Sequence, residues 1–178
     1  MTSTKETAFD PTTTVLLAER VGTYLAPSEE GKGIRVGIAC GRFNGGVTTR
    51  LLDAALEALL ERGVDRKDIT LGWAPGAFEI PLLAKAMIDS GRVDVVLTLG
   101  AVIRGDTGHY DVVAGECARG VQDVQLSTGT PVIFGVLTVN TVDQALERSM
   151  PDHTNKGRET ALTALEMANI ITRGPLGA

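Results

Sequence analysis

The stretch that decides the fold is Gly100-Ala101-Val102-Ile103-Arg104-Gly105-Asp106-Thr107-Gly108-His109-Tyr110. Residues 93–99 before it are almost all apolar, which is typical of a strand covered on both faces, and residues 110–126 after it are spaced as an amphipathic helix. Open α/β sheets bind ligands at the carboxyl ends of their strands, where this stretch lies. Its glycines allow close backbone approach, and the helix start offers free N–H groups to an anion. The stretch therefore predicts a phosphate-binding site with a histidine acid or base beside it.

Strands and helices alternate on both sides of this stretch. The hydrophobic pattern predicts strands over residues 34–39, 69–74, 93–99 and 131–139, and helices over residues 47–62, 79–90, 110–126, 141–148 and 156–172. Gly115 and Gly120 are expected to weaken the third of these helices. Such alternation joins parallel strands by right-handed crossovers and puts helices on both faces. We therefore expect an α/β protein, a three-layer αβα sandwich with a four-stranded parallel sheet of the flavodoxin-like class.

The length of 178 residues fits one domain preceded by an arm. Residues 1–14 are polar and rich in threonine, residues 15–26 are weakly apolar and could dock on another surface, and residues 27–33 form a charged linker. We therefore expect a flexible N-terminal arm and linker over residues 1–33 and a single α/β domain over residues 34–178.

Composition and charge exclude several classes of protein. The net charge of −5 argues against sequence-independent binding of nucleic acid, which needs a basic face. No apolar run approaches the length of about 20 residues that a membrane span needs, and the N-terminus lacks an apolar signal core. Cys40 and Cys117 lack the spacing of metal ligands. We expect a cytoplasmic protein with no nucleic-acid, membrane or metal partner.

Two further strand ends run into unusual loops. Phe43, in Gly41-Arg42-Phe43-Asn44, is either a stacking platform for a flat heterocycle or a cap on the core, with about equal weight. Glu79, in Pro75-Gly76-Ala77-Phe78-Glu79-Ile80-Pro81, falls in the first turn of a helix, where the dipole favours a carboxylate. It either caps that helix or accepts hydrogen bonds from a polyhydroxylated ligand. Parallel strands bring all three loops to one edge of the sheet.

Single residues in the later part of the chain are ambiguous. Asp106 and Thr107 could hold phosphate, or Asp106 could be an ordinary N-cap. His109 is favoured as a group that performs chemistry, because imidazole titrates near neutral pH. Phe134 alone would be assigned to the core, and Arg148 and Lys156 to the surface. If the two cations converge, Arg148 could bind a phosphate with its forked donors and Lys156 could supply a point charge.

These motifs, together with Asn155-Lys156-Gly157, resemble the lumazine synthase family over residues 34–169, in the same order. The resemblance implies a transferase of riboflavin biosynthesis that needs no metal or organic cofactor. Its expected reaction condenses 5-amino-6-ribitylaminouracil with 3,4-dihydroxy-2-butanone 4-phosphate to give 6,7-dimethyl-8-ribityllumazine, phosphate and water. Residues 34–178 would then form one lumazine synthase-like domain.

The resemblance also implies a role for each site residue. His109 would shuttle protons as the catalytic group, and Phe43 would stack on the pyrimidine. The remaining substrate-binding residues of the same chain would line the ribityl chain (Ala77, Phe78, Glu79), contact the pyrimidine edge through backbone groups (Ala101, Val102, Ile103) and seat the phosphate (Asp106, Thr107). Phe134 and Lys156 would approach the pyrimidine from the next subunit of a ring of five, whose Arg148 would grip the phosphate.

Assembly and alternative functions stay open at this stage. Members of the family form pentamers, pairs of pentamers or shells of sixty chains, and the compact loop 149–154 favours a shell; riboflavin synthase is a further expected partner. A non-catalytic flavin- or lumazine-binding protein, a structural shell protein and a flavodoxin-type electron carrier are the alternatives. A pure binder has no need of His109, Arg148 and Lys156 together, which favours the enzyme.

Overall fold

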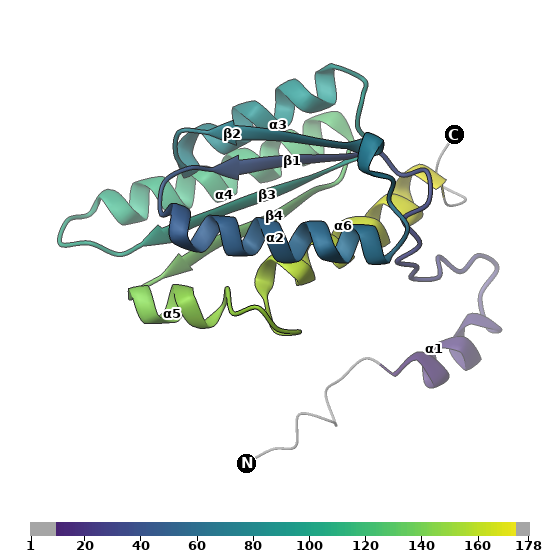
Figure 1. Ribbon diagram of the computed structural model, residues 1–178. Helices are drawn as coiled ribbons and strands as arrows, with labels where there is room; N and C mark the ends of the chain where they lie inside the picture. The colour runs from purple at the N-terminus through teal and green to yellow at the C-terminus, as the bar shows by residue number, and fades with distance from the viewer. Residues whose placement is uncertain (1–9, 174–178) are drawn as a thin grey trace, which may run out of the picture.

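A four-stranded, all-parallel sheet forms the centre of the molecule in the computed structural model, which describes residues 10–173 (Figure 1). Its strands are β1 (Val36–Gly41), β2 (Ile69–Ala74), β3 (Val95–Ile103) and β4 (Val132–Val139), in the spatial order β2-β1-β3-β4. The α-helices are α1 (Pro11–Ala18), α2 (Gly45–Glu61), α3 (Ile80–Asp89), α4 (His109–Thr128), α5 (Val142–Glu147) and α6 (Lys156–Ala168). Shorter turns are η1 (Arg66–Asp68), η2 (Ala77–Glu79) and the π-helical η3 (Asn169–Arg173).

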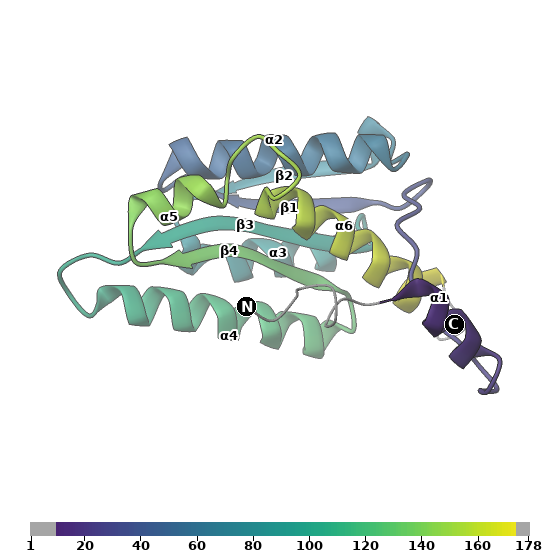
Figure 2. The ribbon, with the colours of Figure 1, turned by 90° about the horizontal axis from the view of Figure 1, so that it is seen from below.

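Helices cover both faces of the sheet, so the predicted three-layer flavodoxin-like sandwich is confirmed (Figure 2). The layer of α2 and α6 packs on one face through side chains such as Leu59 and Leu165, which share a core with Ile38 and Leu97 of the sheet. The layer of α3 and α4 packs on the other face around Ile80 and neighbouring valines. The sheet is therefore buried on both sides, as its nearly continuous apolar strands require.

Two glycines allow the helices within each layer to approach closely. A Cβ at Gly157 would lie 1.9 Å from the carbonyl oxygen of Leu51, so α2 and α6 can touch only if this position has no side chain. A Cβ at Gly120 would lie 2.9 Å from the ring of Pro81 at the start of α3. Gly115 and Gly120 were expected to interrupt this helix, and this was wrong, because α4 runs unbroken from His109 to Thr128. Gly120 instead allows the close contact with Pro81.

The strand before the deciding stretch is longer than predicted. We expected it to end at residue 99, yet β3 continues to Ile103 and pairs with β4 from Val96↔Val132 to Ile103↔Val139. Ala101 and Val102 are buried on this extension. The glycine at position 100 suggested a loop, but pairing with an edge strand holds the backbone extended past it. Part of the predicted loop is therefore a rigid strand.

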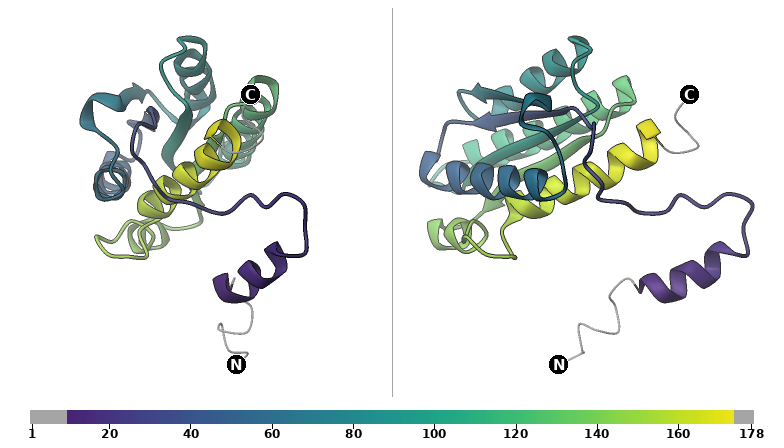
Figure 3. Two further views of the ribbon diagram at one scale, coloured as in Figure 1. Left: turned by 90° about the vertical axis from the view of Figure 1, so that its right-hand side faces the viewer. Right: turned by 45° about the vertical axis from the view of Figure 1, so that its right-hand side comes forward.

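The N-terminal segment lies apart from the sandwich (Figure 3). Helix α1 was not predicted; Asp10 caps it by accepting hydrogen bonds from the backbone N–H groups of Thr12 and Thr13. Val15, Leu16 and Leu17 on it are exposed. Residues 1–9 of the predicted arm lie outside the described residues, and the division at residue 33 stays a prediction. Among the helices of residues 10–173, none combines the length and apolar character that a membrane crossing requires.

Candidate active site

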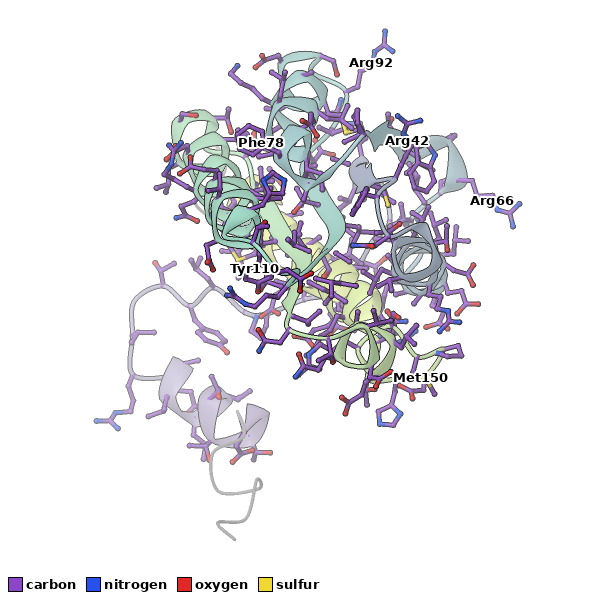
Figure 4. All side chains as sticks on the ribbon, turned by 90° about the vertical axis from the view of Figure 1, so that its left-hand side faces the viewer. Arg42, Arg66, Phe78, Arg92, Tyr110 and Met150 are labelled. Atoms are coloured by element: carbon purple, nitrogen blue, oxygen red, sulfur yellow. The ribbon has the colours of Figure 1, made fainter. Side chains whose placement is uncertain are left out.

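A cavity of about 640 Å³ opens at the carboxyl ends of β1 and β3, where the strand order reverses direction. This is the point at which open α/β sheets bind ligands. Figure 4 looks onto this edge of the molecule, with Phe78 and Tyr110 labelled. Most predicted site residues line this apolar cavity: Phe43, Ala77, Phe78, Glu79, Ala101, Val102, Ile103, Thr107 and His109. Asp106 lies in the same loop, but its side chain is not part of the lining.

Phe43 points into this opening from the loop after β1. Its side chain is 72% exposed, so the alternative in which it caps the core is wrong. The next residue, Asn44, has a left-handed backbone (φ 58°), which asparagine tolerates better than most residues. The Asn44 side-chain amide donates to the carbonyl oxygen of Ala101 at 2.9 Å and fastens the loop to the end of β3. The exposed ring is therefore carried by an anchored loop.

Glu79 closes the short helix η2 at the rim of the cavity. Its Oε2 accepts a hydrogen bond from the backbone N–H of Gly76 at 3.1 Å, so the capping alternative is confirmed. Glu79 also lines the cavity, and capping fixes where its carboxylate points. The proposed contact with hydroxyl groups stays a prediction. Ala77 beside it is buried and Phe78 is half exposed.

The loop 104–108 brings His109 to the cavity at the first residue of α4. The Thr107 hydroxyl accepts a hydrogen bond from the His109 backbone N–H at 3.4 Å. The N-cap of α4 is Gly108, so the alternative that makes Asp106 an ordinary N-cap is wrong. The imidazole is exposed and free to approach a ligand.

A second cavity, of about 250 Å³, lies beside β4, an edge strand within the chain. Phe134, Arg148 and Lys156 all line it, so the convergence that the sequence left open is present. Phe134 is 40% exposed and lines this cavity, so its assignment to the core was wrong; β4 is the edge strand of the sheet formed by residues 10–173. We call this the basic cavity and the first one the apolar cavity.

Backbone hydrogen bonds hold the two cations of the basic cavity together. The Lys156 N–H donates to the carbonyl oxygen of Arg148 at 2.9 Å. Asn155, fully buried, donates to the Met150 carbonyl oxygen and accepts from the Gly157 N–H, both at 2.8 Å, which closes the intervening loop. The Lys156 ammonium pairs with Glu159, and Arg148 donates to the carbonyl oxygen of Gln144. Arg148 therefore presents a guanidinium that a phosphate group can engage.

Residues 33–172 match the family model described as 6,7-dimethyl-8-ribityllumazine synthase. The chain belongs to this family. The match confirms the resemblance drawn from the motifs, and with it a transferase-type enzyme family of riboflavin biosynthesis. It includes every strand of the sheet and the linings of both cavities, and it leaves α1 outside.

Several lining residues were missed by the sequence analysis of this lumazine synthase family member. Tyr110, Val112 and Val113 line the apolar cavity. Val112 and Val113 follow His109 by three and four positions, which puts them on the same helix face, so this spacing could have indicated them. Glu159 and Thr160 line the basic cavity, and they follow Lys156 by three and four positions, so the same helical spacing could have indicated them.

Both cysteines are buried in the described part of the chain. Burial raises the pKa of Cys40 and of Cys117 to about 11, so both stay protonated at neutral pH. Within residues 10–173, no three His, Cys, Asp or Glu side chains are grouped as they would be around a metal ion. The groups that line the cavities are an imidazole, the carboxylates of Glu79 and Glu159, two cations and aromatic rings.

Proposed function

We propose that this protein condenses 5-amino-6-ribitylaminouracil with 3,4-dihydroxy-2-butanone 4-phosphate to give 6,7-dimethyl-8-ribityllumazine, phosphate and water. The observation that carries the proposal is the presence of two cavities with complementary chemistry on a chain of this family. The apolar cavity offers an exposed ring, backbone groups and a histidine, and the basic cavity offers an arginine, a lysine and a second ring.

Each part of the substrates matches one part of the two linings. The pyrimidine would stack on Phe43 and meet the backbone of Ala101, Val102 and Ile103. The ribityl chain would run along Ala77 and Phe78 to the carboxylate of Glu79, which can accept from its hydroxyl groups. Thr107, with Asp106 beside it, and Arg148 would seat the phosphate. Arginine suits that task because its planar fork binds phosphate oxygens with two donors.

The chemistry needs proton transfer and placement more than a protein nucleophile. The amino group of the pyrimidine attacks the ketone carbon, and loss of water forms an imine. Removal of the proton from the carbinol carbon expels phosphate from the adjacent carbon and leaves an enol, which tautomerises to a ketone. The ribitylamino nitrogen then attacks this carbonyl carbon and closes the ring with loss of a second water. His109 would take and return the protons of these steps. Positioning two reactants can contribute roughly 7–11 kcal/mol in the best cases, and a placed acid or base about 10²–10⁴-fold in rate.

The two cavities favour a site shared between chains. The apolar cavity is lined from the loop after β1, the end of β3, η2 and α4, whereas the basic cavity is lined from β4, Arg148 and α6, and none of the described residues lines both. The exposed outer side of β4 leaves Phe134 free to face a neighbour. We propose a ring of five in which the basic cavity of one chain completes the apolar cavity of the next. The compact loop 149–154 favours further assembly of these rings into a shell. We also propose a cytoplasmic location and riboflavin synthase as a partner, as the family resemblance implies.

A continuous absorbance assay for the lumazine chromophore tests the activity. Wild type is expected to form product from both substrates, and Arg148→Ala is expected to lose efficiency with the phosphate substrate. Co-expression of Arg148→Ala chains with His109→Ala chains tests the shared site, since about a quarter of the sites in randomly mixed rings regain both groups. No product above the uncatalysed reaction would instead favour the flavin- or lumazine-binding alternative, which a riboflavin titration of the same sample would then examine.

A further inference from the structure

Arg104 has no role in the function proposed above, yet its side chain contacts Tyr110, Asp111 and Asn140. It is the first residue after β3, and its backbone N–H donates to the carbonyl oxygen of Val139 at 2.9 Å. We propose that Arg104 is a positioning residue that fixes the first turn of α4, and with it His109, relative to the turn that carries Arg148. This proposal rests on the function proposed above.

One side of the Arg104 guanidinium holds the first turn of α4. Its two terminal nitrogens donate to the two carboxylate oxygens of Asp111, at 2.8 and 3.3 Å. The guanidinium carbon also lies 4.1 Å from the centre of the Tyr110 ring, at cation–π distance. Tyr110 and Asp111 directly follow His109. Because Gly105 and Gly108 make the connecting loop permissive, the chain alone defines the position of His109 poorly.

The third Arg104 nitrogen, Nε, begins a path of hydrogen bonds toward the basic cavity. Its Nε donates to Oδ1 of Asn140 at 3.2 Å, in the turn after β4. The Asn140 backbone N–H donates to the side-chain oxygen of Gln144 at 2.8 Å, and the Gln144 carbonyl oxygen accepts from the Arg148 guanidinium at 3.1 Å. The path therefore runs from the turn after His109, through Arg104, to the proposed phosphate ligand.

The geometry requires arginine at the centre of this path. A guanidinium offers five donors in one rigid plane, enough for two carboxylate oxygens and an amide at once, whereas an ammonium is a single point of charge. Isolated exposed ion pairs contribute little, but bidentate pairs within a network are the exception. The hydrogen bonds to Asp111 raise the pKa of Arg104, and those from Arg104 lower the pKa of Asp111. Both groups therefore stay ionised at neutral pH.

The two branches of the path can be cut separately. Asp111→Asn weakens the branch to α4 and is expected to lower kcat with little change in either KM. Asn140→Ala cuts the branch to α5 and is expected to raise KM for the phosphate substrate alone. Arg104→Gln loses both and is expected to show both effects, each about 10-fold. Arg104→Lys is expected to recover kcat in part, by pairing with Asp111, without recovering KM.

Arg119→Gln is the matched control, because Arg119 is also an exposed arginine of α4 that pairs with two acids, Glu116 and Asp123, away from both cavity linings. Its kinetics should equal those of wild type. Equal kinetics for Arg104→Gln and Arg119→Gln would overturn the proposal. A uniform loss in kcat and in both KM values, together with a lowered Tm, would overturn it as well. Failure of the proposed function is distinguishable, since the wild-type chain itself would then form no product.

Discussion

The apolar cavity is gathered from loops, helix starts and the end of one strand, whereas the basic cavity is lined by β4 and carries its two cations at helix ends. Ala101, Val102 and Ile103 lie beyond the stretch in which β3 pairs with β1 and are paired with β4 alone, so one side of their backbone is held by the sheet. Arg148 and Lys156 stand at the end of α5 and the start of α6, joined by one backbone hydrogen bond and a closed loop.

The difference assigns the two cavities different tasks. A rigid, apolar wall with aromatic rings recognises the shape of a flat heterocycle, while half-exposed cations on helix ends recognise charge. His109 faces the apolar cavity and Arg148 the basic cavity, so loss of His109 should act on chemistry and loss of Arg148 on binding of the phosphate substrate. Variants of each cavity test this contrast.

The largest expected effect comes from His109 in the apolar cavity. His109→Ala removes the proposed proton carrier and is expected to lower kcat by about 10²–10⁴-fold while leaving residual turnover from positioning. Steady-state kinetics of the purified variant measure this. His153→Ala is the matched control, since His153 is exposed in loop 149–154 and does not line the apolar cavity. Equal activity of the two variants would remove His109 from the mechanism.

Arg148 in the basic cavity should affect binding instead. Arg148→Ala is expected to raise KM for the phosphate substrate about 10- to 100-fold, the loss typical of hydrogen bonds to charged groups, with KM for the pyrimidine unchanged. Arg92→Ala, on the exposed turn before β3 and labelled in Figure 4, is a control without contact to either cavity lining. A comparable rise in both KM values for Arg148→Ala would contradict a dedicated phosphate ligand.

The apolar cavity could be predicted largely from sequence because its residues follow strand ends. Once the alternation indicated a parallel sheet, the loops carrying Phe43, Glu79 and His109 had to meet at one edge. The strands and helices of the sandwich were predicted to within a few residues, but α1 was missed, and Gly100 was taken for the end of β3, which continues to Ile103. The residues around Gly100 do not by themselves indicate that β4 pairs with residues 100–103 and keeps this segment extended.

The basic cavity could not be predicted in the same way. Phe134, Arg148 and Lys156 come from a strand, a helix end and a helix start, and no periodicity relates them. Their convergence depends on the Asn155 loop and on the backbone bond between Lys156 and Arg148, which are tertiary features. Asp106 was predicted as a phosphate-binding residue from its place in the motif, yet it does not line the cavity. A position within a motif therefore does not determine which way a side chain faces.

The two aromatic rings allow the cavities to be compared directly. Phe43→Leu and Phe134→Leu each remove a stacking surface that is exposed in the chain, and each is expected to raise KM for the pyrimidine about 2- to 10-fold. If the rings of adjacent chains enclose one pyrimidine, the double variant should lose less than the product of the two effects, because the partners share a ligand. Strictly multiplicative losses would place the rings at separate sites.

The smallest expected effect concerns the two buried thiols. Cys40 lies in β1, just before the loop of Phe43, and is fully buried. A raised pKa of about 11 means that the thiolate forms only as the pH approaches that value, so at pH 8 the group is a protonated, inert thiol. Iodoacetamide treatment at pH 8 should leave both mass and kcat unchanged, whereas the same treatment in denaturant should label Cys40 and Cys117. Alkylation of the folded protein accompanied by loss of activity would instead show that a thiol is reactive and needed for turnover. The assignment of proton transfer to the apolar cavity and of phosphate binding to the basic cavity would then be incomplete.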